Sequence, residues 1–157
     1  MHLKRCIVRA LITQDQRMHF TAFTDLAFRI LIYLALDTKR RTTISDIAGI
    51  YGVSKNHLMK VVNQLTRAGI VEANRGPNGG LLLARLPKEV TVGEVVRLTE
   101  GNVEIVECFR ADNQCTITPA CTLKSILGES LEAFFDVLDN YTVQDLVKNR
   151  TQLEKLL

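Results

Sequence analysis

The 157-residue sequence predicts a mainly α-helical fold that carries one small β-hairpin. Apolar residues recur at helical spacing within residues 24–35, 55–68 and 118–139, which is typical of amphipathic helices. Two short apolar runs, 70–73 and 81–84, flank a segment containing Gly, Asn and Pro, which is typical of a hairpin. The length suits one small domain with an appended helical element.

The first two helices have recognisable start signals. Thr24 is expected to be the N-cap of the first helix, with Asp25 in its first turn, where a negative charge suits the helix dipole. Thr43 and Asp46 have the spacing of a capping box, which predicts a short second helix ending near Tyr51.

The third helix is expected to begin after the N-cap Ser54 and to bury Leu58, Val61, Val62 and Leu65, which share one face. Helix, turn, helix and hairpin in this order predict a winged helix-turn-helix. The opposite face carries side chains that reach phosphates or base edges in a major groove. These residues are Ser54, Lys55, Asn56, His57, Lys60, Asn63, Gln64 and Arg67.

The hairpin tip and the charge distribution point to the same partner. The tip offers Asn74, Arg75 and Asn78, and Arg75 is expected to enter a minor groove. Residues 1–90 contain 14 Lys and Arg against 6 Asp and Glu, whereas residues 91–157 contain 6 against 11. A polar outer face is common on surface helices, but the turn, hairpin and basic first half together favour binding to double-stranded DNA.

The second half predicts helices around an irregular segment. Residues 91–94 have the pattern of a capping box that opens a short helix, and residues 142–145 are expected to begin a final short helix. Thr118 and Pro119 are expected to be the N-cap and first residue of a long helix that ends near Asp139. Its apolar stripe has no later partner of equal length, so we expect a homodimer.

The chain is expected to contain three parts. Residues 1–17 form an N-terminal extension that precedes Met18, a candidate native start, and Cys6 within it has no assigned role. Residues 18–90 form the winged helix-turn-helix, and residues 91–157 hold a cysteine-containing loop and the dimerisation helix. The extension lacks the pattern of a secretory signal, and no segment approaches the roughly 18 apolar residues of a membrane span, so a cytoplasmic location is expected.

Cys108, Cys115 and Cys121 lie within fourteen residues, with gaps of six and five residues between them. Buried structural thiols are disfavoured, because the first two lie in a polar segment. A thiol redox switch would pair two cysteines and leave one over. Thiolates also bind zinc, copper(I) and iron–sulfur clusters, and these gaps are longer than those of structural zinc sites. A metal centre is favoured, with its fourth ligand open.

The sequence does not predict an enzyme. It contains no C-x-x-C, Gly-rich phosphate loop, nucleophile elbow or H-E-x-x-H motif. The histidines His2, His19 and His57 are scattered, and His57 lies on the predicted DNA-reading helix.

Five segments carry a resemblance to a known family: 23–29 (FTDLAFR), 53–69 (VSKNHLMKVVNQLTRAG), 75–80 (RGPNGG), 117–121 (ITPAC) and 139–142 (DNYT). With them the sequence resembles the bacterial winged-helix iron–sulfur regulators, a family that includes the IscR regulators. The last two segments resemble its nitric-oxide-sensing branch in particular.

This resemblance implies a homodimer that binds a palindromic operator, represses NO-detoxification genes while its cluster is intact, and releases DNA when NO attacks the cluster. Cys108, Cys115 and Cys121 match the ligands of the family, with a 4Fe–4S cluster favoured over a 2Fe–2S cluster. In IscR-like members a histidine three residues after the last cysteine completes the set, and Lys124 stands there instead. The NO-sensing branch uses a carboxylate near the N-terminus of the partner subunit, which Asp25 matches. The gap before the second cysteine is longer than is usual in the family.

Asp25 and Arg29 are expected to form a switch. Arg29 follows Asp25 by one helical turn and can pair with its carboxylate once the cluster is lost. The simpler alternative for Asp25 is an ordinary first-turn acid. The alternative for the whole chain is a cluster-free winged-helix regulator that uses zinc or thiol oxidation.

Overall fold

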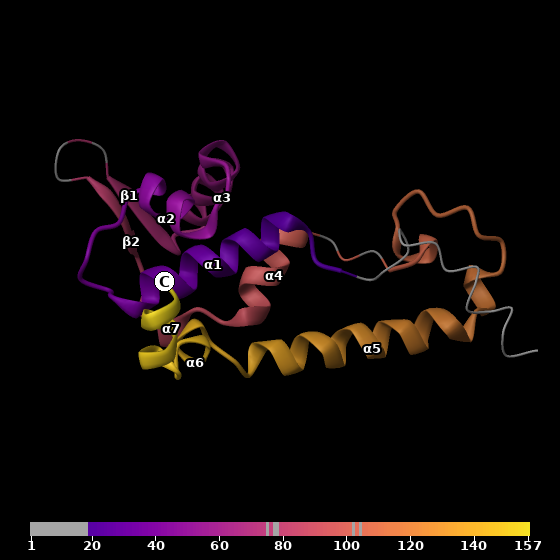
Figure 1. Ribbon diagram of the computed structural model, residues 1–157. Coiled ribbons are helices and arrows are strands. Elements are labelled where there is room, and N and C mark those ends of the chain that lie inside the picture. Colours follow the sequence, from indigo (N-terminus) through magenta and orange to yellow (C-terminus); the bar gives the residue numbers. More distant parts are fainter. Residues whose placement is uncertain (1–18, 75, 77–78, 102, 104) are drawn as a thin grey trace, which may run out of the picture.

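The computed structural model describes residues 19–74, 76, 79–101, 103 and 105–157, so the extension 1–17 lies outside the described residues (Figure 1). Within them the fold is mainly α-helical with one antiparallel hairpin, as predicted. The elements are α1 (Ala22–Leu36), α2 (Ile44–Tyr51), α3 (Lys55–Arg67), β1 (Val71–Asn74), β2 (Gly80–Leu83), α4 (Val92–Glu100), α5 (Thr122–Asp139), α6 (Val143–Leu146) and α7 (Arg150–Leu156), with 3-10 turns at Pro87–Glu89, Glu107–Phe109 and Thr118–Ala120.

Helix α1 is the central helix of the core, where Ile30 and Leu31 are fully buried. Its N-cap is Thr21, whose hydroxyl accepts a hydrogen bond from the Thr24 backbone N–H at 3.4 Å. The prediction of Thr24 as N-cap is therefore wrong, because Thr24 lies inside the helix with a fully buried side chain. Asp25 is in the first turn, as predicted.

Helix α3 packs against both α1 and α2. The capping box of α2 is confirmed: Asp46 N–H donates to the Thr43 hydroxyl at 3.1 Å, and Thr43 N–H donates to the Asp46 carboxylate at 3.0 Å. Leu58 and Leu65 of α3 are buried in the shared core, as the apolar spacing predicted. Helices α2 and α3, which follow each other in the sequence, thus form a helix-turn-helix.

The hairpin β1–β2 forms the wing, and its register places Val71 opposite Leu83. Thr42, in the loop between α1 and α2, pairs with Leu81 through two backbone hydrogen bonds of 3.2 and 2.8 Å. Gly80 has a φ of 142°, and a Cβ there would lie 3.2 Å from the Thr42 carbonyl oxygen. Glycine suits this close approach and this φ value, and the two bonds to Thr42 anchor the wing to the body of the fold at its second strand.

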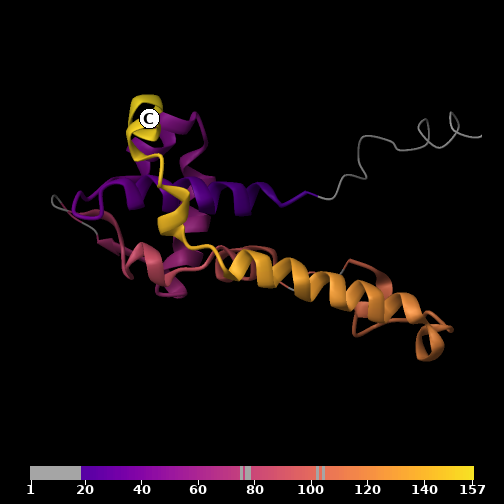
Figure 2. The same cartoon turned by 90° about the horizontal axis from the view of Figure 1, so that it is seen from below.

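The long helix α5 starts later than predicted. Thr118 and Pro119 belong to a separate 3-10 turn, and Cys121 is the N-cap of α5, so it does not lie in the first helical turn. Cys121 has an extended backbone (φ −83°, ψ 108°), which interrupts the helical path between the two elements. The 18 residues of α5 all remain at least partly exposed, and the helix extends away from the winged part of the molecule (Figure 2).

After α5 the chain returns to α1. Val143 and Val147 are buried in the core, and the helix start predicted at Thr142 is confirmed, with a capping box that joins Thr142 and Asp145. Helix α7 was not predicted as a separate element. The box at residues 91–94 is only half formed, because the Glu94 side chain pairs with Arg85 at 2.6 Å. None of the helices in the described part of the chain combines the length and apolar character that a membrane span needs.

Candidate nucleic-acid interface and metal centre

Helix α3 presents the polar face that was predicted from its spacing. Ser54, at the N-cap position, makes no capping hydrogen bond within the described chain. The outward residues are exposed, and the apolar residues of the opposite face are buried. The exposed residues are Ser54, Lys55, Asn56, His57, Lys60, Asn63 and Arg67.

Gln64 departs from this pattern. It is half-buried, and its Nε2 donates a hydrogen bond of 2.5 Å to the Leu98 carbonyl of α4. Its amide therefore joins α3 to α4, and the expectation that Gln64 points outward is wrong.

Charged and polar side chains meet near the tip end of the wing, where Asn74, a predicted tip residue, ends β1. Asn74 donates to the Glu72 carboxylate at 2.5 Å, and Arg41 lies 3.4 Å from the same oxygen. The tip residues Arg75 and Asn78, which were predicted to contact DNA, lie outside the described residues.

The three clustered cysteines lie in the loop between α4 and α5, at the end of α5 that is furthest from the winged part (Figure 1). Cys108 is in a 3-10 turn, Cys115 precedes the second such turn, and Cys121 follows it. All three are free thiols and half-buried. The loop thus keeps its thiols unpaired and partly accessible.

Local hydrogen bonds shape the second part of this loop. The Cys115 N–H donates to Asn113 Oδ1 at 3.0 Å, and Asn113 Nδ2 donates to the Thr118 hydroxyl at 3.0 Å. The Cys121 N–H donates to the Thr118 carbonyl at 3.3 Å. Asn113 and Thr118 therefore position the two later cysteines, a role that the sequence reasoning did not assign to them.

The donor types in this loop fit a thiolate-bound metal centre. Unpaired cysteines are the ligands that zinc, copper(I) and iron–sulfur clusters select. In the described part of the chain, however, no three Cys, His, Asp or Glu side chains come together as a site for a single metal ion. Three thiolates leave such a centre one ligand short of four.

Asp25 lies in the first turn of α1, apart from the cysteine loop in sequence, with 55% of its side chain exposed. Its carboxylate pairs with Arg29 Nη2 at 2.8 Å, as the one-turn spacing predicted. The Arg29 guanidinium also lies 5.5 Å from the centroid of the Tyr51 ring, and the Tyr51 hydroxyl donates to the Arg29 carbonyl at 3.2 Å. The Asp25–Arg29 pair therefore contacts α2 of the helix-turn-helix.

The sequence reasoning missed Glu100, the last residue of α4. Its carboxylate accepts hydrogen bonds from the Thr21 N–H at 2.8 Å, the Thr21 hydroxyl at 3.0 Å and the Thr24 hydroxyl. Burial acts to raise the pKa of Glu100, but the hydrogen bonds from Thr24 and Thr21 outweigh it and hold this pKa below its ordinary value. No local signal could reveal these contacts, because the partners lie more than 70 residues apart.

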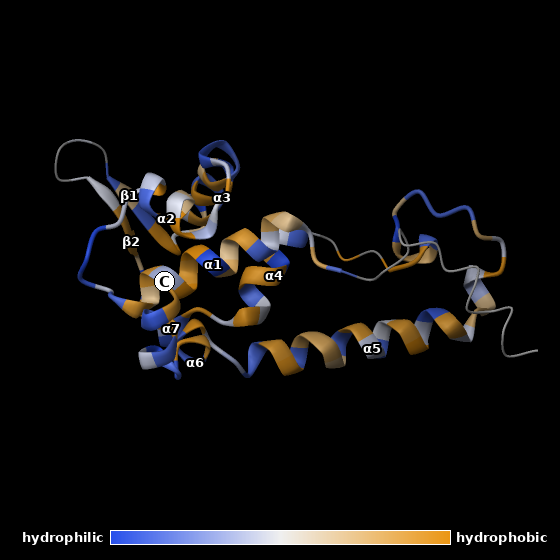
Figure 3. Ribbon diagram, in the orientation of Figure 1, coloured by the Kyte–Doolittle hydropathy of each residue, from blue (hydrophilic) through white to orange (hydrophobic). Residues whose placement is uncertain are grey.

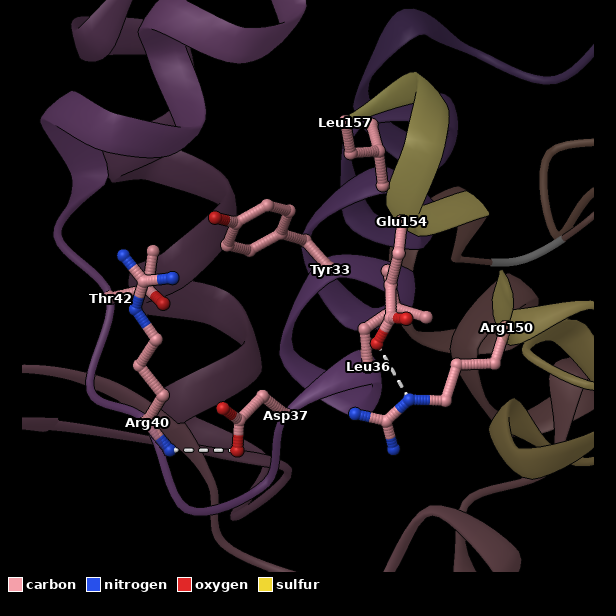
Figure 4. Close-up of a pocket in the computed structure, with 8 residues that line it drawn as sticks. All are labelled: Tyr33, Leu36, Asp37, Arg40, Thr42, Arg150, Glu154 and Leu157. Atoms are coloured by element: carbon pink, nitrogen blue, oxygen red, sulfur yellow. Dashed lines mark hydrogen bonds and ion pairs between the residues drawn. The ribbon is translucent and has the colours of Figure 1, made fainter. Parts of the chain in front are cut away.

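A pocket of about 260 Å³ lies at the opposite end of α1, between its last turn, the loop that follows, and α7 (Figure 4). Three of its charged side chains have partners: Arg150 pairs with Glu154 at 2.7 Å, and Asp37 accepts from the backbone N–H of Arg40 at 3.2 Å. The pocket belongs to neither the α3 face nor the cysteine loop.

Comparison with known proteins gives the family. The family model Rrf2, described as iron-dependent transcriptional regulator, matches residues 20–149. The chain is 47% identical over 142 residues to the HTH-type transcriptional regulator NsrR of Shouchella clausii, which covers 89% of this chain and 95% of that protein. It is 48% identical over 142 residues to the regulator of the same name from Bacillus subtilis, with 89% and 97% covered.

Solved structures agree with the fold. CymR, the global cysteine regulator of B. subtilis, superposes with a TM-score of 0.68 at 25% identity, covering 85% of this chain and 98% of that one. T. potens IscR has the same fold with a TM-score of 0.67 at 24% identity, covering 84% and 88%. The predictions of a winged-helix regulator and of a protein that is not an enzyme are confirmed by these relatives. The chain belongs to the Rrf2 family of transcriptional regulators.

Proposed function

We propose that this chain is a homodimeric DNA-binding repressor that senses nitric oxide through an iron–sulfur cluster and then releases its operator, which derepresses NO-detoxification genes. The observation that carries the proposal is the set of three free, half-buried thiols in one loop outside the winged helix-turn-helix. The similarity to regulators named NsrR and to a family described as iron-dependent supports it.

Cys108, Cys115 and Cys121 would hold the cluster, which we propose to be 4Fe–4S, with 2Fe–2S as the other type. The cluster would supply irons to which NO can bind. Lys124 follows Cys121 by three residues and is exposed, and a protonated amine is not a metal ligand. As the family resemblance implies, we assign the fourth ligand to Asp25 of the partner subunit, and the accessible position of this carboxylate at a helix start is consistent with that role.

The homodimer is supported by the exposed apolar face of α5, along which apolar residues recur (Figure 3). Leu123 and Ile126 are 56% and 53% exposed, which is unusual for large apolar side chains in the same stripe. A second copy that packs its own α5 against this face would bury them. A twofold dimer with two copies of α3 then suits a palindromic double-stranded operator in the cytoplasm.

DNA contact is assigned to the exposed face of α3, and to Arg75 and Asn78 at the wing tip. Lys and Arg side chains there would neutralise phosphates, and Asn and His side chains would reach base edges. The residues in this assignment are Ser54, Lys55, Asn56, His57, Lys60, Asn63, Arg75 and Asn78.

Asp25 and Arg29 would form the switch. When Asp25 is not a ligand, the Arg29 guanidinium 2.8 Å away neutralises its charge. Since Arg29 also contacts Tyr51 of α2, a change in this pair changes the support of the DNA-reading helix. A coupling of about 1–3 kcal/mol would alter DNA affinity roughly 5- to 150-fold.

The test is an anaerobic purification followed by iron and sulfide analysis, absorbance spectroscopy and an NO titration beside an operator-binding assay. We expect iron and sulfide in the protein, and DNA release as NO bleaches the absorbance. Cys115→Ala should give colourless protein without NO-dependent release. Zinc in place of iron, or release caused by thiol oxidants alone, would favour the cluster-free alternative.

A further inference from the structure

The last turn of α4 is bonded to both α1 and α3. Three donors at the start of α1, the Thr21 N–H and the hydroxyls of Thr21 and Thr24, converge on the Oε1 atom of Glu100. Two residues earlier, the Leu98 carbonyl accepts the 2.5 Å hydrogen bond from Gln64 of α3. One helical turn thus contacts the helix that carries Asp25 and the helix that reads DNA.

The position of Glu100 is favourable only because of α1. A carboxylate at the C-terminus of its own helix faces the negative end of that helix dipole. The N-terminus of α1 offers free N–H groups and the positive end of a second dipole, which stabilise the same charge. The Thr24 hydroxyl is fully buried, so its bond to Glu100 is shielded from competition with water. Glu100 therefore ties the end of α4 to the start of α1.

Gln64 plays the matching part for α3. The Leu98 carbonyl belongs to the last turn of α4, where carbonyls have no partner within the helix. Gln64 satisfies it, and its neighbours on α3 are the exposed Asn63 and the buried Leu65. A displacement of the last turn of α4 must therefore either break this hydrogen bond or move α3 with it.

The cysteine loop begins directly after the same turn of α4. Gly101 ends α4 with a φ of 67° and a ψ of −138°, a conformation that glycine adopts readily, and its N–H bonds to the Arg97 carbonyl at 3.1 Å. From there the chain enters the segment that contains Cys108. Gly101 is therefore the residue at which the cysteine loop leaves α4.

We propose that the last turn of α4 couples the cysteine loop to the DNA-reading helix, with Glu100 and Gln64 as positioning residues. This inference rests on the proposed function, in which loop and DNA affinity are linked. A shift of the cysteine loop at Gly101 displaces the last turn of α4 directly. A shift of α1, when Asp25 changes partner, displaces the same turn through the hydrogen bonds of Glu100. Gln64 carries it from there to α3.

The experiment compares operator affinity of cluster-loaded and cluster-free full-length protein. Glu100→Gln removes the charge at nearly constant shape, and Gln64→Leu removes the bond to Leu98. We expect both variants to keep the wild-type iron and sulfide content and absorbance. The operator affinity of the cluster-loaded protein divided by that of the cluster-free protein should fall at least about 5-fold, toward one. Glu94→Gln is the matched control, since this glutamate lies in the same helix but binds Arg85, and it should keep the wild-type ratio.

A purely structural role would weaken both affinities by the same factor, and an unchanged ratio in both variants overturns the coupling. A wild-type ratio of one overturns the proposed function itself. If a variant does not fold, amide hydrogen exchange in the wild-type protein tests the coupling instead. The exchange rates of residues 97–101 and 62–66 should rise together when the cluster is removed, and a rise confined to the cysteine loop overturns the inference.

Discussion

The Arg97 guanidinium binds the Asp139 carboxylate through two hydrogen bonds, of 2.8 Å from Nη1 and 2.6 Å from Nη2. The same guanidinium lies 4.3 Å from the centroid of the Phe135 ring. These contacts join α4 to the C-terminal part of α5, and they hold the pKa of Asp139 below its ordinary value. The pair is the joint between the long helix and the rest of the molecule.

Replacing Arg97 by alanine should lower the free energy of unfolding by about 1 kcal/mol. The pair is partly exposed, which limits its contribution, but the two-point geometry and the ring contact add to it. Urea unfolding measures the change. Arg150→Ala is the control, because its exposed pair with Glu154 lies within α7 and should contribute roughly 0.3–0.5 kcal/mol. Equal losses in the two variants would contradict the special role of Arg97.

Gly93→Ala tests how tightly this joint is packed. Gly93 is buried in α4, and a Cβ there would overlap the Asp139 carboxylate. Alanine in place of glycine within a helix usually raises the free energy of unfolding by roughly 0.5–1 kcal/mol. Gly93→Ala should therefore bring no such rise while Asp139 is present. In an Asp139→Ala background the rise should appear. A double-mutant cycle in urea measures the difference, and an identical effect in both backgrounds would show that the carboxylate is not displaced.

Lys60→Ala should weaken operator binding and reduce its dependence on salt. Lys60 is exposed on α3 and is assigned to a phosphate. Losing one phosphate contact reduces the slope of log affinity against log salt by about one for each bound subunit. Fluorescence anisotropy at several salt concentrations measures the slope. Lys155→Ala, in the last turn of α7, should leave it unchanged, and the proposed interface is wrong if both variants behave alike.

Asp25→Ala should change the absorbance of the anaerobic protein and alter its response to NO, because it removes the proposed fourth ligand. Asp112→Ala is the control, since this exposed acid lies inside the cysteine loop but has no assigned role. Absorbance and operator binding are followed during an NO titration. An unchanged spectrum together with an unchanged NO response would remove Asp25 from the mechanism.

Ile126→Asp should shift the protein from dimer to monomer, because it places a charge in the exposed apolar stripe of α5. Ser125→Asp adds the same charge one residue earlier, which helical spacing places on the polar side of α5. Sedimentation velocity at several concentrations distinguishes the two states. A variant at Ile126 that sediments as the wild type does would exclude this face from the dimer.

Signals that act between near neighbours in the chain were predicted from the sequence. The capping box at Thr43 and the helix start at Thr142 formed, because each depends on residues three positions apart. The hairpin and the buried face of α3 also follow from local spacing, as does the clustering of the cysteines in one loop. The types of residue available for DNA contact and for metal binding were therefore evident before the fold was known.

Two local signals did not lead to the structure that they predicted. Thr118 and Pro119 carry a helix start signal, but they begin only a 3-10 turn. Helix α5 begins after Cys121, whose backbone is extended. Glu94 has the spacing of a capping box, but Arg85 binds its carboxylate instead. Arg85, nine residues before Glu94, replaces the local backbone N–H as the partner, since a guanidinium adds a full positive charge to the hydrogen bond.

By itself, then, the sequence determined the helices before α7, the buried face of α3 and the residue types that reach the surface. Only the tertiary structure decided that Gln64 turns from the DNA-reading face to Leu98, and that Glu100 binds Thr21. The physical reason is distance along the chain: Thr21 and Glu100 are 79 residues apart. Their side chains meet only once α1 has packed against α4, and periodicity along one helix carries no information about a partner on another.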